Sequence, residues 1–395
     1  MKRRLVCPGF RFAGAAGGIK KKGGLDVGLI VSDRAASAAA VFTGNRVKAA
    51  PVVLSQKVLR ASRGRLRAIV VNSGNANACT GRRGMADARR MTELAAAVAD
   101  CTPAEVLVAS TGVIGLPLAM DRVEAGVATA GRGLGIDNFP AFAEAIMTTD
   151  RRPKVAGRTL TVGRGEITLI GCTKGAGMIA PNMATTLTFV TTDAAIAPGL
   201  LDRMVRRAVE PTFNAIAVDG DTSTNDTLAV LASRVGPKPA GKDLGRFEAA
   251  LTDLLDDLAH QLMTDGEGVH HVVTLRVRGA STERAARTVA RRIATSPLVK
   301  TAIAGGDPNW GRILCAVGNA GVPIKPDRLD LWLDDLRVVA QGAAVPELNE
   351  ARAAAIMKQP SYTVTVDLGA GSSEARYLAC DLSHEYVTIN ADYRS

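Results

Sequence analysis

The sequence contains few aromatic residues, few histidines and no long apolar run. Aromatic residues make up only 4% of the 395 residues, and there are four histidines. The core must therefore be built from Val, Leu, Ile and Ala. No stretch of about 18 uncharged apolar residues occurs, so we expect no membrane-spanning helix. The hydrophobic fraction of 47% and the charged fraction of 22% are ordinary for a globular protein, which excludes disorder as the dominant state.

Paired cysteine motifs and a secretion signal are also missing. None of the six cysteines forms a CxxC pair or has a histidine at ligand spacing, so we expect no metal site. We expect most of these cysteines to be buried thiols in a reducing cytoplasm. The basic residues after Met1 mimic the start of a signal peptide, but Pro8, Gly9 and Arg11 interrupt the apolar run that should follow. These features predict a cytoplasmic protein.

The net charge of +11 comes from 49 basic and 38 acidic residues that are scattered along the chain. No aromatic residues alternate with the basic ones and no helix-turn-helix signature is present, so nucleic acid is not an expected partner. The charge is typical of a basic protein surface or of a site that attracts anionic small molecules. The sequence also lacks the P-loop, dinucleotide-binding and nucleophile-elbow motifs, and we expect no cofactor.

Helix and strand patterns mix without a regular βαβ rhythm, which favours a layered α/β or α+β fold over a barrel. Apolar runs predict strands at 25–31, 68–72, 106–109, 185–192, 271–278, 330–339, 361–367 and 374–380, and a hairpin over 158–171. Helical spacing predicts helices at 84–100, 139–147, 198–210 and 243–264. Two more helices are expected to begin at Pro117 and after an N-cap at Ser281.

The segment Lys174–Thr192 has the composition of an N-terminal nucleophile site. A loop rich in Gly and Pro runs into a β-branched, alternating stretch that begins at Thr185. If the bond between Ala184 and Thr185 were cut, the new α-amino group of Thr185 could act as the base for its own hydroxyl. On composition alone, the alternative that these threonines merely form a strand stays open.

A second feature is the glycine-containing turn Ser110–Gly115, which follows a predicted strand. A strand end that turns through glycine presents backbone N–H groups to an anion or an oxyanion. Many strand ends carry glycine, so this turn does not identify a site by itself.

Longer motifs extend over almost the whole chain. They are Gly9–Lys20, Val71–Ala78, Ala109–Gly115, Ile146–Asp150, Lys174–Thr185, Val218–Asp226, Gly305–Arg312 and Ile389–Ser395. In content and order they resemble the motifs of the ornithine acetyltransferase (glutamate N-acetyltransferase) family of arginine biosynthesis. The resemblance implies an α/β fold of mixed α+β layers, an aminopeptidase-like sandwich with a self-cleaved N-terminal nucleophile.

The resemblance also implies how the chain is processed and which residues act. Self-cleavage between Ala184 and Thr185 would give an α chain (1–184) and a β chain (185–395) that stay together as (αβ)2, a heterotetramer, or a larger assembly. Thr185 would be the nucleophile. The family's other site residues map onto Thr111 and Gly112 as the oxyanion hole and onto Thr148, Lys174, Thr185, Glu267, Asn390 and Ser395 as substrate contacts. Without the resemblance, Lys174 and Glu267 would be interpreted as ordinary surface charges.

The activity implied by the resemblance is the transfer of an acetyl group from N2-acetylornithine to L-glutamate. An acetyl-Thr185 ester would form first and then be attacked by the glutamate amine, which predicts ping-pong kinetics. Whether acetyl-CoA also serves as a donor stays open. Two alternatives stay open as well: a related N-terminal-threonine amidase or aminopeptidase, in which water replaces glutamate, and a non-catalytic basic binding protein.

Two positions depart from the family pattern. The family commonly reads Gly-Glu-Gly-Ala-Thr-Lys where this chain has Gly266–His271, so His271 replaces a lysine and one cationic contact near the pocket is in doubt. The adjacent histidines His270 and His271 are not expected to share a metal, and a surface or substrate-lining role for one of them stays open. The last residue is Ser395 where threonine is common, and a hydroxyl is retained.

Overall fold

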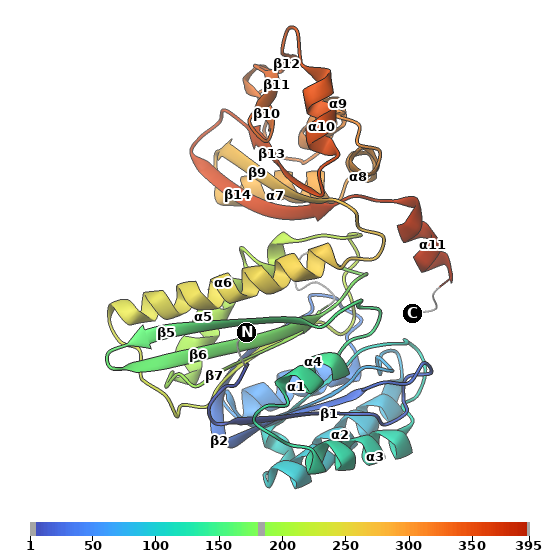
Figure 1. Ribbon diagram of the computed structural model, residues 1–395, viewed down its shortest axis with the longest axis vertical. Coiled ribbons are helices and arrows are strands. Elements are labelled where there is room, and N and C mark those ends of the chain that lie inside the picture. Colours follow the sequence, from blue (N-terminus) through green and yellow to red (C-terminus); the bar gives the residue numbers. More distant parts are fainter. Residues whose placement is uncertain (1–4, 181–185, 393–395) are drawn as a thin grey trace.

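A computed structural model describes residues 5–180 and 186–392 as a large main unit and a smaller C-terminal unit (Figure 1). The main unit is built on an eight-stranded mixed sheet of order β4-β3-β2-β8-β7-β6-β5, and β1 pairs with β2 beside this path. Its strands are β1 (Phe10–Ala15), β2 (Val27–Phe42), β3 (Arg65–Asn72), β4 (Val106–Ser110), β5 (Lys154–Val162), β6 (Gly165–Lys174), β7 (Leu187–Thr192) and β8 (Thr227–Ala232).

The main sheet folds over on itself, so that its two halves form two layers with a core between them. β2 belongs to both halves, because its first part pairs with β3 up to Ser37 and its last part, Ser37–Phe42, pairs with β8. The inner core joins Ile69 of β3 and Leu107 of β4 to Phe189 of β7. The mixed α/β class and the layered arrangement predicted from the sequence are therefore confirmed.

Helices cover the two outer faces of this sandwich. α5 (Pro198–Val209) and α6 (Lys242–Thr264) pack on the half that contains β5 to β8 (Figure 1). α6 places Leu251, Leu255 and Leu258 on one buried face, at the spacing of an amphipathic helix. α2 (Gly81–Ala99) and α3 (Met120–Arg132) cover the half that contains β1 to β4. The main unit also contains α1 (Ala50–Ala61), α4 (Phe139–Ala145) and the 3-10 turns η1 (Pro103–Glu105) and η2 (Phe213–Ala215).

The C-terminal unit has its own sheet, of order β12-β11-β10-β13-β9-β14. Its strands are β9 (Val272–Ala280), β10 (Asp330–Leu333), β11 (Leu336–Ala340), β12 (Ala343–Ala344), β13 (Ser361–Asp367) and β14 (Ser373–Cys380). Its helices are α7 (Glu283–Ala294), α8 (Pro297–Ala304), α9 (Trp310–Gly318), α10 (Glu350–Met357) and α11 (His384–Asp392), with the 3-10 turn η3 (Pro326–Arg328). α11 extends from this unit toward the main unit (Figure 1). None of the described helices is long and apolar enough to span a membrane.

Most of the elements predicted from the sequence are present with shifted ends. β4, β9, β13 and β14 and helices α2, α4, α5 and α6 lie within a few residues of their predicted ranges. The strand predicted at 25–31 is the first part of β2, and the hairpin predicted over 158–171 is the longer pair β5–β6. The strand predicted from Thr185 begins at Leu187 in the described part of the chain.

The helix expected from Pro117 is wrong in its start, because α3 begins only at Met120. The carbonyl groups of Leu116 and Pro117 accept hydrogen bonds from Asn75 Nδ2, at 3.0 and 3.2 Å. These bonds hold Pro117 in a loop beside the Ser110–Gly115 turn instead of in the first turn of a helix. Backbone carbonyls outside a helix need such partners when they are partly buried.

Two predictions in the C-terminal unit are also wrong. The N-cap of α7 is Thr282 and not Ser281, since the Thr282 side chain accepts a hydrogen bond from Ala285 N at 3.1 Å. The single strand predicted at 330–339 is the pair β10 and β11, because Asp334 takes the left-handed conformation (φ 49°) and turns the chain. Aspartate is among the residues that adopt this conformation most readily.

The expectation that most cysteines are buried is wrong as well. Half of them are buried, one is partly buried and two are exposed: Cys7, Cys172 and Cys380, then Cys101, then Cys79 and Cys315. The two exposed cysteines lie in the loop just before α2 and on α9. Burial raises the pKa of the Cys7 and Cys172 thiols, so these two behave as small apolar groups.

Candidate active site

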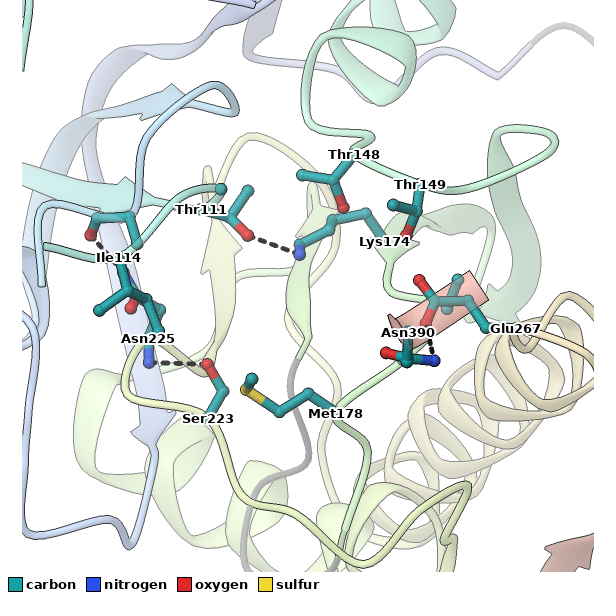
Figure 2. Close-up of a pocket in the computed structure, with 14 residues that line it drawn as sticks. Thr111, Ile114, Thr148, Thr149, Lys174, Met178, Ser223, Asn225, Glu267 and Asn390 are labelled. Atoms are coloured by element: carbon teal, nitrogen blue, oxygen red, sulfur yellow. Dashed lines mark hydrogen bonds between the residues drawn. The ribbon is translucent and has the colours of Figure 1, made fainter. Parts of the chain in front are cut away.

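A polar pocket opens at the rim of the sandwich, where the two layers of the main sheet meet α11 (Figure 2). Six of the predicted site residues line it, while Ala184, Thr185 and Ser395 lie outside the described residues. The lining residues are Ala76, Thr111, Gly112, Ile114, Thr148, Thr149, Lys174, Ala176, Gly177, Met178, Ser223, Asn225, Glu267 and Asn390. The structure thus brings together side chains from both sequence halves that the motifs suggested.

Lys174 is the cationic centre of the pocket. It is the last residue of β6 and is only 4% exposed, so it is not an ordinary surface charge. Its Nζ donates a hydrogen bond to Thr111 Oγ1 at 2.6 Å, across the gap between the two layers (Figure 2). Burial lowers the pKa of Lys174, while the carboxylates of Asp150 and Asp226 act in the opposite direction.

The turn that carries Thr111 and Gly112 is held by its backbone. Thr111 N donates to Asn72 O at 3.0 Å. Thr111 Oγ1 accepts the bond from Lys174, which leaves the hydroxyl proton available to the pocket. In the described chain, Gly112 N donates to no protein acceptor. Gly112 has φ +130°, and a Cβ there would lie 2.6 Å from Asn75 N and Gly74 C, so no larger residue fits. The turn can therefore offer one hydroxyl and one N–H to an oxyanion.

Glu267 forms the anionic side of the pocket. Its Oε2 accepts a hydrogen bond from Asn390 Nδ2 at 3.2 Å, so α11 reaches the pocket through Asn390 (Figure 2). The backbone N–H of Glu267 donates to Ala176 O at 2.8 Å, which ties this loop to the segment after β6. A Cβ on Gly177 would lie 2.2 Å from Glu267 Oε2, so a larger residue there would displace the Glu267 carboxylate from its present place.

Asn225 is a pocket residue to which sequence reasoning assigned no role. It precedes β8, and its Nδ2 donates to Ala76 O at 2.6 Å and to Ser110 O at 2.8 Å. These bonds connect the second layer of the sandwich to the turn that carries Thr111. The signal was present in the motif Val218–Asp226, but the motif alone does not say which side chain points inward.

Two acids beside the pocket, one buried and one partly buried, were also missed. Asp226 is 1% exposed, and neither of its carboxylate oxygens has a hydrogen-bond partner among the described residues. Burial raises its pKa well above the ordinary value for aspartate, although Lys174 acts against this. Asp219 accepts bonds from Met178 N (2.6 Å), Ile179 N (2.9 Å) and Tyr386 Oη (3.2 Å), and it thereby joins a pocket wall to α11.

The adjacent histidines lie outside the described pocket, and His270 lies on the surface. His270 Nε2 lies 3.1 Å from Glu385 Oε2, and its side chain is 54% exposed. His271 Nδ1 lies 2.7 Å from Gln359 O. Within the described part of the pocket neither histidine is a lining residue. The exchange of lysine for His271 therefore removes no charge from the pocket wall itself.

The chain is similar to known proteins over its full length. Residues 11–395 match the model of the ArgJ family. The arginine biosynthesis bifunctional protein ArgJ of Geobacter sulfurreducens is 48% identical over 391 residues, which cover 98% of this chain and 99% of that protein. The protein of the same name from Rhizobium meliloti is 46% identical over 395 residues, covering 98% of this chain and 95% of that one. This chain belongs to the ArgJ family.

The family predicted from the sequence motifs is thereby confirmed. Among solved structures, this ArgJ-family chain is similar to a crystal structure of the arginine biosynthesis bifunctional protein ArgJ from Bacillus halodurans. The sequence identity is 38% and the TM-score is 0.50, over 52% of this chain and 98% of that chain. The pocket described above is thus the pocket of an ArgJ-family protein.

Proposed function

We propose that this ArgJ-family chain transfers the acetyl group of N2-acetylornithine to L-glutamate, with Thr185 carrying the acetyl group between the two. The observation that supports this best is the pairing of Lys174 with Thr111 on one side of a pocket whose other side carries Glu267. Relatives at 46–48% identity bear the name arginine biosynthesis bifunctional protein. The activity therefore belongs to the pathway that the names of these relatives give.

In the first half of the reaction, Thr185 Oγ attacks the acetyl carbonyl, and the C–N bond to ornithine breaks. The hydroxyl proton passes through the α-amino group of Thr185 to the leaving ornithine amine. Charge on the carbonyl oxygen is stabilised by the Thr111 hydroxyl and by Gly112 N–H. Because the Lys174 ammonium donates to Thr111 Oγ1, it polarises that hydroxyl and strengthens it as a donor.

In the second half, the α-amine of glutamate attacks the acetyl-Thr185 ester and leaves as N-acetylglutamate. Both substrates carry a carboxylate, for which the remaining N–H donors of Lys174 are suitable partners. The side-chain ammonium of ornithine would lie against Glu267, which Asn390 holds in place. Thr148 and Ser395 complete the proposed contacts. A pocket with one cationic and one anionic side suits substrates that are amino acids.

The same proposal includes cleavage between Ala184 and Thr185 into chains 1–184 and 185–395. Two observations support it. Leu187, two residues after Thr185 in the sequence, pairs with Lys174 at the end of β6, so β7 begins beside the pocket lysine shortly after the proposed cleavage point. The solved Bacillus halodurans chain is matched over 98% of its own length, yet the match covers only 52% of this chain. Residues 185–395 alone would make up a similar share of this chain. The cytoplasmic location and the (αβ)2 assembly stay predictions.

Mass spectrometry of the purified protein under denaturing conditions tests both parts. We expect two fragments that divide at Ala184/Thr185, and a single full-length chain for Thr185→Ala. Incubation with N2-acetylornithine alone should add one acetyl mass to the fragment 185–395, and glutamate should remove it as N-acetylglutamate. An uncleaved but fully active wild type would contradict the mechanism.

The acceptor distinguishes the proposed transferase from the hydrolase alternative. Free acetate produced at the same rate with and without glutamate would favour an N-terminal-threonine amidase. A second incubation with acetyl-CoA and glutamate, without acetylornithine, shows whether acetyl-CoA is also a donor. No acetyl transfer from either donor, together with no cleavage, would favour a binding protein.

A further inference from the structure

A buried ion cluster lies directly behind the pocket wall. The side chains of Lys154 and Asp150 are fully buried, and that of Asp265 is 4% exposed. Lys154 Nζ lies 2.6 Å from Asp265 Oδ2 and is hydrogen-bonded to Asp150 Oδ1 as well. The attraction between buried ions often fails to offset the loss of their hydration, so such a cluster is weak evidence for stability. Stability alone therefore does not explain why these three charged side chains are buried together.

Asp150 holds two walls of the pocket by their backbones. Its Oδ2 accepts a hydrogen bond from Thr148 N at 2.9 Å, and its Oδ1 accepts one from Gly175 N at 2.8 Å. Thr148 lines the pocket, and Gly175 directly follows the pocket residue Lys174. Hydrogen bonds to an ionised carboxylate are stronger than those between neutral groups. Asp150 therefore joins the wall before β5 to the wall after β6.

Asp265 connects the third wall to the same cluster. It lies just after α6 and two residues before Glu267. Its Oδ2 accepts a hydrogen bond from Arg151 N at 3.1 Å as well as binding Lys154. The three pocket walls come from distant parts of the chain, and Lys154 contacts both acids that hold them.

We propose that Lys154 is a positioning residue: by binding Asp150 and Asp265 at once, it fixes the pocket walls relative to one another. The walls carry Thr148, Lys174 and Glu267, which the proposed function uses to bind its substrates. Lys154 itself lines no part of the described pocket. The reaction that Lys154 would serve is the proposed function, so this inference rests on that function. The contacts of Lys154 follow from the geometry alone.

Lys154 also influences the charge balance of the pocket. Burial lowers the pKa of Lys174; Asp150, Asp226 and Glu267 raise it, and the positive charge of Lys154 lowers it further. Removal of Lys154 therefore raises the pKa of Lys174. Because the proposed reaction uses the Lys174 ammonium, the alkaline limb of the pH–rate profile, where Lys174 loses its proton, moves to higher pH.

The matched control is on the same strand. Arg158 of β5 also bridges two aspartates, Asp253 at 2.5 Å and Asp257 at 3.1 Å, but these lie on α6 and outside the pocket. We expect kcat/KM for acetyl transfer to fall about 100-fold in Lys154→Met, the size expected when reacting groups are misplaced by about 1 Å. Arg158→Met should stay near the wild-type value. Rates are divided by the cleaved fraction of each sample.

A second variant separates positioning from folding. Lys154→Met leaves two buried carboxylates facing one cation, which could unfold the protein. The double variant Lys154→Met/Asp265→Asn leaves Asp150 opposite Lys174, so the buried charges balance again. We expect the Tm to recover in the double variant, with kcat/KM still about 100-fold low and the pH limb at higher pH. Recovery of kcat/KM together with the Tm would overturn the proposal.

Ornithine binding, measured by calorimetry, tests the positioning role of Lys154 independently of the proposed acetyl transfer. If the wild type transfers no acetyl group, the proposed function fails, but the positioning role is still decided. Weaker ornithine binding by folded Lys154→Met/Asp265→Asn than by Arg158→Met supports it, and equal affinities of the two variants overturn it.

Discussion

The two units of the molecule bury different kinds of side chain. Within the described residues of the C-terminal unit, the buried charged groups are Lys300 and Asp381, and the rest of its core is mostly Ala, Val, Leu and Ile. The main unit buries six charged residues in its described part, of which Lys154, Lys174, Asp226 and Asp265 lie at or beside the pocket and Asp26 and Asp193 lie elsewhere. Buried charge is unfavourable unless it is paired. The concentration of such groups around the pocket indicates where the fold sacrifices stability for chemistry.

The comparison predicts that the same substitution at two buried lysines lowers activity in the main unit and stability in the C-terminal unit. Lys174→Met should lower kcat/KM by about 10²- to 10³-fold, because it removes the donor that polarises Thr111. Lys300 Nζ donates instead to Cys380 O, at 2.5 Å. Lys300→Met should lower the free energy of unfolding by about 1–3 kcal/mol, because that carbonyl loses its partner. Steady-state transfer rates and urea unfolding of both variants are the measurements.

The comparison requires that the Lys300 variant loses stability without losing activity. Lys300→Met should keep the wild-type kcat/KM per folded molecule when it is assayed well below its Tm. A comparable loss of activity in both variants would show that the C-terminal core is coupled to the pocket.

The second prediction concerns Asp226 and the pH dependence of stability. Its pKa is raised in the folded state by burial. The folded protein therefore keeps this proton where the unfolded chain has lost it, and the contribution of Asp226 to stability falls as the pH rises above about 3.9. Asp226→Asn removes this fall. We expect the variant to gain about 1–3 kcal/mol over the wild type at pH 8 and nothing at pH 4.

Urea unfolding of both proteins at the two pH values measures this difference. Asp367→Asn is the matched control, since Asp367 pairs with Arg278 on the surface of the C-terminal unit at 2.9 Å. A control that gained as much at pH 8 would remove the distinction between the two units.

The sequence predicted the long elements with a clear period well and most of the short helices poorly. β13 and α6 were located closely because their side chains alternate or repeat at helical spacing over their whole length. β1, α1, α8, α9, α10 and α11 were missed; of these, α10 is eight residues rich in alanine, and α11 has no buried residue at all. A helix as short as α10 shows its apolar spacing over too few residues to be recognised, and α11 has no buried stripe to recognise.

The site divides in a similar way. The pocket residues Lys174 and Glu267 were found because whole motifs resemble those of a known family. Lys154 was not found, because a lysine at the start of a strand has no local pattern that reveals burial. Its partners are fixed by tertiary structure: Asp265 is far along the chain from Lys154 and meets it only when α6 packs beside β5.

The third prediction tests the apolar side of the comparison. Ile293 on α7 is fully buried in the C-terminal core. Ile293→Val should lower the free energy of unfolding by about 0.5–1.5 kcal/mol, because one methylene is lost from a packed core. We expect kcat/KM and KM to stay at their wild-type values. Urea unfolding and steady-state kinetics check the two halves of this prediction, and a changed KM would contradict it.

The smallest predicted effect concerns α11, which belongs to the C-terminal unit in sequence but contacts the pocket through Asn390. Glu385 of this helix lies 3.1 Å from His270 Nε2 and 3.8 Å from Arg151 Nη2, in exposed pairs. Exposed ion pairs contribute about 0.2–1 kcal/mol, so Glu385→Gln should raise the KM for acetylornithine about two- to fourfold without changing the Tm. The difference should vanish at high salt, which screens such pairs.

Asp335→Asn is the control for this effect, because Asp335 forms an equally exposed pair with Arg352, at 2.6 Å, in the same unit. Its KM should equal that of the wild type at every salt concentration. If Glu385→Gln also leaves the KM unchanged at low salt, the surface pairs of Glu385 do not hold α11, and its contacts through Tyr386 and Asn390 are sufficient. If its KM rises as expected, surface charge on the C-terminal unit contributes to substrate binding. The cores of the two units then differ in role, the C-terminal core serving stability and the main core serving the pocket. α11, which joins the units, belongs to the C-terminal unit and yet serves the pocket.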